Sequence, residues 1–211
     1  MGQFNQGVLG AFSGKVGSVI GSNWRDIDYM RGLPKKSSKP ASAKQLIARA
    51  KFKMLIEFLV LVKSVIDKGF KHADGRRASA YNQGFTANKD AFAGTETEPE
   101  LDFSKIILSK GSGVIKATGC KLAAEGDGVL SLSWDAISGN VNALTDQATI
   151  VLYCEEDKEV VVHSGVLRSL NTAQLQIPSN WKGCTIHGYL YMTSKEDKNS
   201  LTSYAGPLSI M

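Results

Sequence analysis

The sequence predicts an α+β protein in which an N-terminal β-ribbon and a helical segment are followed by an antiparallel β-sandwich. Three observations predict this class. Glycines are interspersed with large apolar residues over 1–34, apolar residues recur at helical spacing after residue 43, and short strand-like runs follow one another from residue 101. With 43% hydrophobic and 21% charged residues in a chain of 211, the composition is that of an ordinary globular protein.

We expect three parts: a glycine-rich ribbon arm over 1–34, a basic linker and helical region over 35–94, and a β-sandwich over 95–211. Charge changes at the second boundary. Residues 1–94 carry 16 Lys/Arg and 6 Asp/Glu, whereas residues 95–211 carry 9 and 14. Basic segments attract nucleic acid, anionic membranes or acidic protein surfaces, so the basic half of one copy could also meet the acidic half of another.

The ribbon is expected to contain bent strands over 17–24 and 27–32, with a turn at Arg25-Asp26. Glycine within a strand marks a bulge or the close approach of another backbone. Because an isolated two-stranded ribbon is barely stable in water, this segment is expected to pack on folded protein, either its own chain or a neighbour. The apolar residues expected to make that contact are Phe12, Val16, Val19, Ile20, Trp24 and Tyr29.

Helical spacing of apolar residues predicts a helix over 43–68. Ser42-Ala43-Lys44-Gln45 matches a capping box at its start, and Gly69 is a plausible stop. Its later turns are apolar on several sides and are expected to be buried. A second helix is expected over 79–92, weakened by Gly84. The acidic segment 94–100 is the expected boundary before the sandwich.

The remaining chain reads as short strands separated by turn signals such as Asp127-Gly128. No helix-length periodic stretch interrupts them, which favours a β-sandwich over a parallel α/β sheet. The expected strands cover residues 101–108, 113–117, 129–134, 148–154, 159–163, 173–177, 184–192 and 208–210.

The order of details over 101–211 resembles a fibronectin type III or immunoglobulin-like domain. Residues 129–134 look like a second strand that ends in a core tryptophan, and 150–153 look like the third strand. Residues 173–177, followed by Trp181 and then by 184–192, look like the later passage between sheets. No cysteine pair is evident for an inter-sheet disulfide, which fits the fibronectin type III variety better than antibody domains.

The front of the chain resembles a bacterial family of unknown function whose members have about this length. The residues that carry the resemblance are 10–21 (GAFSGKVGSVIG), Trp24, Arg31-Gly32-Leu33-Pro34, Gln45, Ala80-Tyr81-Asn82 and Trp134. The family has no known activity or catalytic residues, so the resemblance transfers no function.

We expect no catalytic residue and no cofactor. Residues 10–16 (GAFSGKV) fail as a phosphate loop, because three residues instead of four separate the glycines and Val16 stands where Ser or Thr is needed. Gly111-Ser112-Gly113 lacks the third glycine of a dinucleotide fingerprint. No serine lies in a nucleophile elbow.

No metal site is expected either. His72, His163 and His187 share no local metal-ligand spacing. The three cysteines, Cys120, Cys154 and Cys184, are odd in number and form no C-x-x-C, so they are expected to be small buried thiols. The acidic residues Glu155, Glu156, Asp157 and Glu159 are expected to form a solvated hairpin tip rather than a calcium site.

His187, Tyr189 and Tyr191 alternate along one expected strand and so share a face, opposite Ile186, Leu190 and Met192. Tyrosines offer a large contact area at low entropic cost, which makes this face a candidate for binding. The alternative is burial, since both faces of a central strand are often covered.

Two functions follow. The first is a non-enzymatic structural or assembly protein that docks its ribbon on a second copy or another protein by strand addition, forming an oligomer, filament or particle. The alternative is a nucleic-acid-associated module using the basic stretch 31–53, which has few aromatic residues and no helix-turn-helix or zinc-finger pattern. The cations of that alternative are Arg31, Lys35, Lys36, Lys39, Lys44 and Arg49.

The N-terminal residues show no charged segment followed by an apolar one, so no secretory signal is expected. The most apolar run, 54–66, contains Glu57 and Lys63 and is too short to span a bilayer. We therefore expect a cytoplasmic protein that does not insert into membranes. Leader-independent export and incorporation into a larger particle are the alternatives.

Overall fold

The computed structural model describes residues 3–4, 10–24, 27–35, 38–71, 78–95, 97–126, 128–137 and 141–210. They fall into two compact units, residues 1–42 and residues 43–211. The expected mixed α+β class with antiparallel sheets is confirmed. The division differs from the three parts expected at 1–34, 35–94 and 95–211, because the helical region and the sandwich form one unit.

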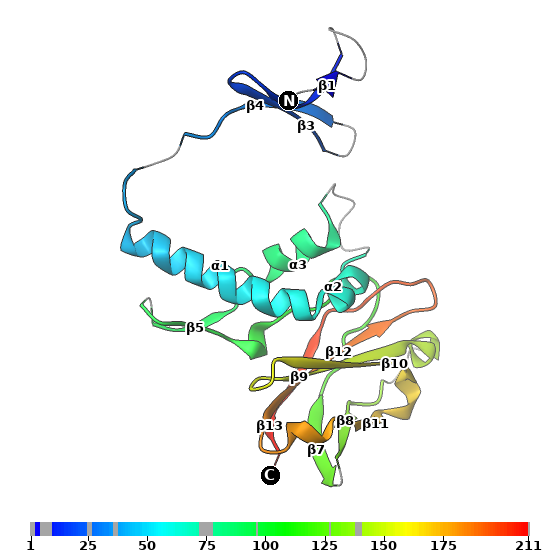
Figure 1. Ribbon diagram of the computed structural model, residues 1–211. Helices are drawn as coiled ribbons and strands as arrows, with labels where there is room; N and C mark the ends of the chain where they lie inside the picture. Colours follow the sequence, from blue (N-terminus) through cyan, green and yellow to red (C-terminus); the bar gives the residue numbers. More distant parts are fainter. Residues whose placement is uncertain are drawn as a thin grey trace. The chain divides into compact units, whose positions relative to one another are not determined.

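The first unit is a four-stranded antiparallel sheet whose strands stand in chain order (Figure 1). Its strands are β1 (Gln3–Phe4), β2 (Phe12–Val16), β3 (Val19–Trp24) and β4 (Ile27–Gly32).

The ribbon's strands match the expected ones only in part. β3 and β4 correspond to the strands expected at 17–24 and 27–32, whereas β1 and β2 were not expected. β2 and β3 are joined at Gly17-Ser18, where Gly17 has a φ of 58° that costs a residue without a Cβ nothing. The turn expected at Arg25-Asp26 lies outside the described residues.

Three helices begin the second unit: α1 (Ala43–Leu61), α2 (Lys63–Gly69) and α3 (Ala80–Asn88). The single helix expected over 43–68 is therefore two helices. Val62 breaks it, with φ of −98° and ψ of 16° and a long backbone hydrogen bond of 3.4 Å from its N–H to the oxygen of Phe58. Burial of the later turns is confirmed, since Leu59, Val65 and Ile66 are all buried.

The second helix ends at Asn88 rather than at residue 92. Beyond it, β5 (Phe92–Gly94) pairs with β6 (Pro99–Leu101) in an antiparallel hairpin. The segment 94–100 was expected to separate two domains, but its two ends belong to the paired strands of this hairpin inside the second unit.

The expected sandwich is present as two antiparallel sheets, one in the order β10-β9-β12-β13 and the other in the order β11-β8-β7. The strands are β7 (Lys121–Gly126), β8 (Val129–Ser133), β9 (Gln147–Cys154), β10 (Glu159–Leu167), β11 (Thr172–Gln176), β12 (Thr185–Thr193) and β13 (Ser203–Ser209).

Two expected strands were wrong and one was missed. Residues 102–108 and 113–117 form no strand, and β7 was not expected. β7 lacks the apolar alternation that marks a strand: five of the six residues in KLAAEG are exposed. β13 was expected only from residue 208, because Gly206 and Pro207 interrupt its apolar pattern.

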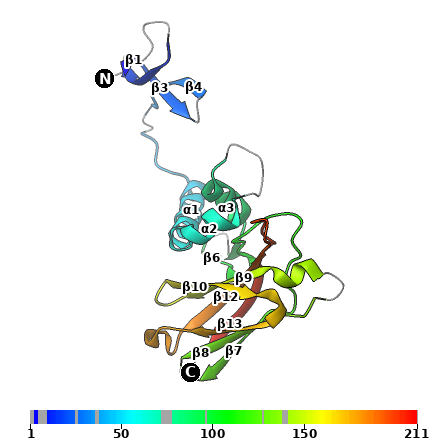
Figure 2. The same ribbon diagram turned by 90° about the vertical axis from the view of Figure 1, so that its right-hand side faces the viewer.

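The four-stranded sheet of the second unit, β10-β9-β12-β13, is covered on both faces, by the three-stranded sheet on one side and by the helices on the other (Figures 1 and 2). Along β12, Ile186, Leu190 and Met192 face the core between the sheets, whereas Tyr189 and Tyr191 face the core under the helices. A strand buried on both faces shows no polar alternation, as the near-continuous burial of β9 and β12 illustrates.

Within the described ranges, none of the helices combines the length and the hydropathy that crossing a bilayer would need.

Candidate interaction surface

The ribbon sheet presents apolar side chains on both of its faces. Opposed residues in antiparallel strands point to the same face, and residues two apart along a strand share it. The pairs Val16↔Val19 and Gly21↔Met30 define one face, and the pairs Trp24↔Ile27 and Ile20↔Arg31 define the other. The six expected contact residues are therefore divided: Phe12, Val16 and Val19 lie on the first face, and Ile20, Trp24 and Tyr29 on the second.

The ribbon has almost no interior of its own. Gly21 is the one buried residue among those described in the first unit. The Phe12 ring lies over it, so that a Cβ at Gly21 would come within 2.1 Å of the Phe12 backbone oxygen and 2.6 Å of its ring. Among the described residues of the ribbon, this close approach and strand pairing hold the sheet together, and no large apolar side chain is buried.

Large apolar side chains are correspondingly exposed. Trp24 is 47% exposed, Tyr29 46% and Val16 43%. Sequence reasoning missed Ile27, which is 41% exposed, and Met30, which at 72% is the most exposed large apolar residue of the described chain. The alternation along β4 could have identified both residues, since Ile27 shares one face with Tyr29 and Met30 lies on the other face.

Each unit has strands with an unpaired edge, among them β4 and β10. β4 is the last strand of the ribbon, and β10 is the first strand of the four-stranded sheet; neither has a further strand beside it among the described residues. The N–H and C=O groups on such an edge are available to pair with another chain.

The basic residues of the nucleic-acid alternative belong to different units. Arg31, Lys35 and Lys39 lie in the first unit, and Lys44 and Arg49 lie on α1 in the second. Lys36 lies outside the described residues. The use of 31–53 by a nucleic acid therefore stays a prediction, which binding to a random duplex at low ionic strength would test.

The face of His187, Tyr189 and Tyr191 is not a binding surface. The helices cover it, and the exposed fractions are 5%, 0% and 2%. The Tyr189 hydroxyl donates to the backbone oxygen of Phe103 at 2.9 Å. The ring of His187 stacks on Phe103, with 4.4 Å between centroids, and its Nδ1 lies 2.8 Å from the Tyr204 hydroxyl.

Two tyrosines under the helices hold their phenolic protons more firmly than a free tyrosine does. Burial, ahead of the nearby Glu155 carboxylate, raises the pKa of Tyr153 to about 12. Burial also raises the pKa of Tyr189 well above its usual value.

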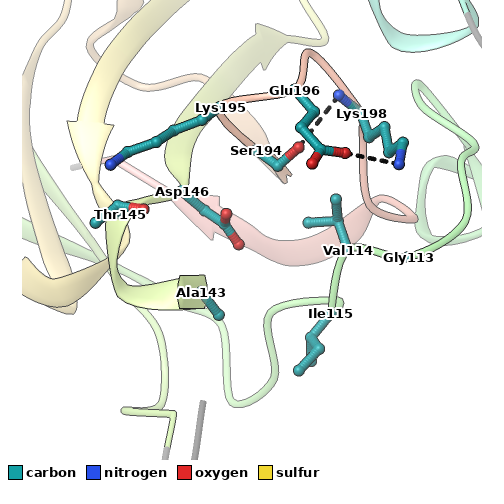
Figure 3. Close-up of a pocket in the computed structure, with 10 residues that line it drawn as sticks. All are labelled: Gly113, Val114, Ile115, Ala143, Thr145, Asp146, Ser194, Lys195, Glu196 and Lys198. Carbon is teal, nitrogen blue, oxygen red and sulfur yellow. Dashed lines mark hydrogen bonds and ion pairs between the residues drawn. The ribbon is translucent and has the colours of Figure 1, made fainter. Parts of the chain in front are cut away.

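A pocket of about 410 Å³ opens at one end of the sandwich (Figure 3). Three of its charged residues have partners: Lys198 lies 2.7 Å from Glu196, and Asp146 lies 3.6 Å from the buried Arg168, which is not itself part of the lining. Its other lining residues are Gly113, Val114, Ile115, Ala143, Thr145, Ser194 and Lys195.

The acidic run between β9 and β10 forms an exposed hairpin tip, as expected. Its carboxylates nevertheless accept hydrogen bonds. Glu159 accepts from the Trp181 indole at 3.0 Å and from Asn180 at 3.2 Å, and these bonds lower its pKa. Glu156 accepts from the backbone N–H of Thr185 at 2.8 Å. The tip is thereby fixed against the segment that leads into β12.

A comparison with known protein families shows where this chain belongs. The sequence pattern of the "Family of unknown function (DUF6266)" matches residues 11–206. The chain belongs to this family. The resemblance of its sequence to a family of unknown function is thus confirmed. The matched region of the DUF6266 chain begins just before β2 of the ribbon and ends within β13, the last strand of the sandwich.

Solved structures that are similar to this DUF6266 chain match only part of it. The fn3 domain of human collagen alpha-1(XX) chain is 16% identical, with a TM-score of 0.38, and covers 49% of this chain and 92% of its own. A structure named "Myokine structure" is 10% identical, with a TM-score of 0.36, and covers 47% and 100%. The twitchin kinase region of C. elegans is 12% identical, with a TM-score of 0.35, and covers 44% and 16%. The search of curated proteins found no match.

Proposed function

We propose that this DUF6266 chain is a non-enzymatic assembly protein that binds a second copy of itself through its N-terminal ribbon. The observation that carries the proposal is a ribbon whose described residues include exposed apolar side chains on both faces, an edge strand without a further partner and, apart from Gly21, no buried residue. A sheet of this kind gains free energy when another protein covers its faces, because burial of apolar surface contributes about 25 cal/mol per Å².

The acceptor in this proposal is the β10 edge of the second copy. Sheet edges are usually protected by lysine, proline or shortness, and β10 has nine residues with neither lysine nor proline. A bulge between Ser164 and Val166 leaves 159–164 as its regular part. Those six positions match the six residues of β4. Main-chain hydrogen bonds between the two edges would supply affinity, as in other cases of strand addition.

Charge favours an antiparallel arrangement of the two strands. The basic residues Arg31 and Lys35 stand at the C-terminal end of β4, and the acidic tip with Asp157 and Glu159 stands at the N-terminal end of β10. Antiparallel pairing brings these ends together, whereas parallel pairing would bring Asp28 toward the acidic tip. Exposed charges of this kind mainly set orientation and association rate.

Pairing of β4 with β10 uses two different surfaces on each copy. Such a heterologous contact produces a ring if the rotation between copies closes, and an open filament if it does not. The smallest ring is a dimer in which β4 of each copy pairs with β10 of the other, so the proposal predicts a dimer or a larger assembly.

The mass of the full chain in solution tests the proposal, measured by light scattering over a range of concentrations. We expect the full chain to form oligomers and the fragment 43–211, which contains both apolar cores, to be a monomer. A full chain that stays monomeric at high concentration contradicts the proposal.

The acceptor edge has a separate test. Val162→Lys puts a charge on the β10 edge, where Val162 is 45% exposed, and should reduce the mass toward that of a monomer. The matched control is Leu201→Lys, since Leu201 is 44% exposed and lies outside every strand. Equal masses for the two variants would exclude β10 as the acceptor.

A further inference from the structure

Two cysteines expected to be separate core residues meet at one end of the four-stranded sheet. Cys154 is the last residue of β9, and Cys184 directly precedes β12. Asp157 lies in the turn between β9 and β10. The two sulfur atoms and a carboxylate oxygen of Asp157 all lie within 4.8 Å of one another.

Sheet register produces this meeting. β9 and β12 are antiparallel neighbours in which Cys154 stands opposite Ile186, two residues beyond Cys184. The backbone N–H of Glu155 donates to the oxygen of Thr185 at 3.1 Å, which extends the pairing past the last strand residues. Residues 30 positions apart in the sequence are thereby held at the spacing of metal ligands.

A fourth donor group stands beside these three. The Cys154 thiol lies 3.8 Å from Oε2 of Glu156, which also accepts the Thr185 N–H. The side-chain amide of Asn180 donates to Oδ2 of Asp157 at 3.0 Å. Hydrogen bonds that orient ligating carboxylates from outside are a regular feature of metal sites.

We propose that Cys154, Cys184, Asp157 and Glu156 bind one zinc ion. Two thiolates with oxygen ligands in a four-coordinate arrangement suit Zn²⁺, whereas Mg²⁺ and Ca²⁺ select oxygen alone. The thiols are buried and the two carboxylates are exposed, so the ion sits at the surface with its sulfur ligands inside. Both thiols give up their protons when the ion binds.

Bound zinc would join the β9–β10 hairpin to the start of β12 and reduce the negative charge of the acidic tip. The site is independent of the ribbon, since all four ligands belong to the second unit. Its presence or absence can therefore be decided without reference to self-association.

Titration of the reduced, metal-free full chain with Co²⁺ or Cd²⁺ tests the site through the thiolate-to-metal charge-transfer band. We expect the band to saturate at about one ion per chain and to disappear in Cys154→Ser and in Cys184→Ser. Asp157→Asn should weaken zinc affinity about tenfold or more. Cys120→Ser is the matched control, because Cys120 lies outside the cluster, and it should leave the band unchanged.

A measurement without substitution guards against variants that fail to fold. Zinc should lower the rates at which Cys154 and Cys184 of the wild-type chain are alkylated, whereas the partly exposed Cys120 should react at the same rate with and without zinc. Equal alkylation of all three with and without zinc would overturn the proposal. So would a single reactive thiol in the freshly purified, denatured protein, because Cys154 and Cys184 would then form a disulfide.

Discussion

At the residue scale, Arg168 holds together the end of the sandwich. Its side chain is 3% exposed and donates to the backbone oxygens of Ile115 at 2.6 Å and Lys116 at 3.4 Å. Its own backbone oxygen accepts from the Trp134 indole at 2.9 Å. One buried guanidinium thus fixes a segment without regular structure, and Asp146 is the nearby counter-charge at 3.6 Å.

We predict that Asp146 makes stability fall as pH rises. Burial raises the pKa of Asp146 above its usual 3.8, although the Arg168 guanidinium acts in the opposite direction. A raised folded-state pKa gives stability that is complete below 3.8 and is lost as pH rises through the folded value. Between acidic and neutral pH, the free energy of unfolding of Asp146→Asn should therefore rise relative to that of the wild type.

Urea unfolding at a series of pH values measures this difference. The exposed Asp90, changed to Asn, is the control for the removal of a carboxylate from the surface. If the free energy of unfolding of the wild type instead rises relative to that of Asp146→Asn as pH increases, the attraction of Arg168 outweighs the cost of burial.

At the element scale, a buried asparagine attaches α3 to the rest of the second unit. The side-chain amide of Asn88, the last residue of the helix, donates to the oxygens of Gly84 at 2.8 Å and Ile107 at 2.7 Å. Its Oδ1 accepts the N–H of Ile107, also at 2.7 Å. The extended segment around Ile107 thereby obtains from a side chain the hydrogen bonds that it would otherwise find in a sheet.

Asn88→Ala should lower the free energy of unfolding by about 2–4 kcal/mol, because both backbone groups of Ile107 lose their partner inside the protein. Asn82→Ala, on the exposed side of α3, should change it by less than about 0.5 kcal/mol. Chemical denaturation monitored by circular dichroism provides both values. Similar losses for the two variants would show that Asn88 does not attach α3.

Elements with a single exposed face, or with a long apolar run, could be predicted from the sequence. β8 and β11 alternate cleanly, and α1 shows helical spacing. Residues 113–117 could not be predicted, because backbone oxygens there bind Arg168, more than 50 positions away, instead of a strand. The break at Val62 and the polar β7 are likewise decided by packing rather than by local pattern.

The candidate sites were predictable to different degrees. Exposed apolar residues of the ribbon could be found from composition, but their division between two faces required the register of β2, β3 and β4. The meeting of Cys154 and Cys184 could not be found from the local sequence pattern, since it depends on the register between β9 and β12 and on the path of the chain beyond their ends.

At the scale of the whole molecule, the sandwich depends on the helices. Val151, Tyr153, Tyr189 and Tyr191 are buried in the core that the four-stranded sheet shares with α1 and α2. Full exposure of such a side chain costs about 1.5–3 kcal/mol, so the cost for these four, roughly 6–12 kcal/mol, is comparable to the typical stability of a small domain.

We therefore predict that the fragment 95–211, cut at the boundary that the sequence suggests, does not fold. The fragment 43–211 should unfold cooperatively in urea and show a near-ultraviolet circular dichroism spectrum from its packed tyrosines. Identical unfolding midpoints for the two fragments would mean that the sandwich is stable without its helical cover.

The order of these layers along the chain matters while the protein is being made. α1 leaves the ribosome long before β12, the strand that carries Tyr189 and Tyr191, which is completed only at Thr193. At a synthesis rate of roughly 5–20 residues per second, the helices wait on the order of ten seconds for their sheet. Throughout that interval the apolar side of the helices is exposed to chaperones and to neighbouring nascent chains on the same messenger RNA.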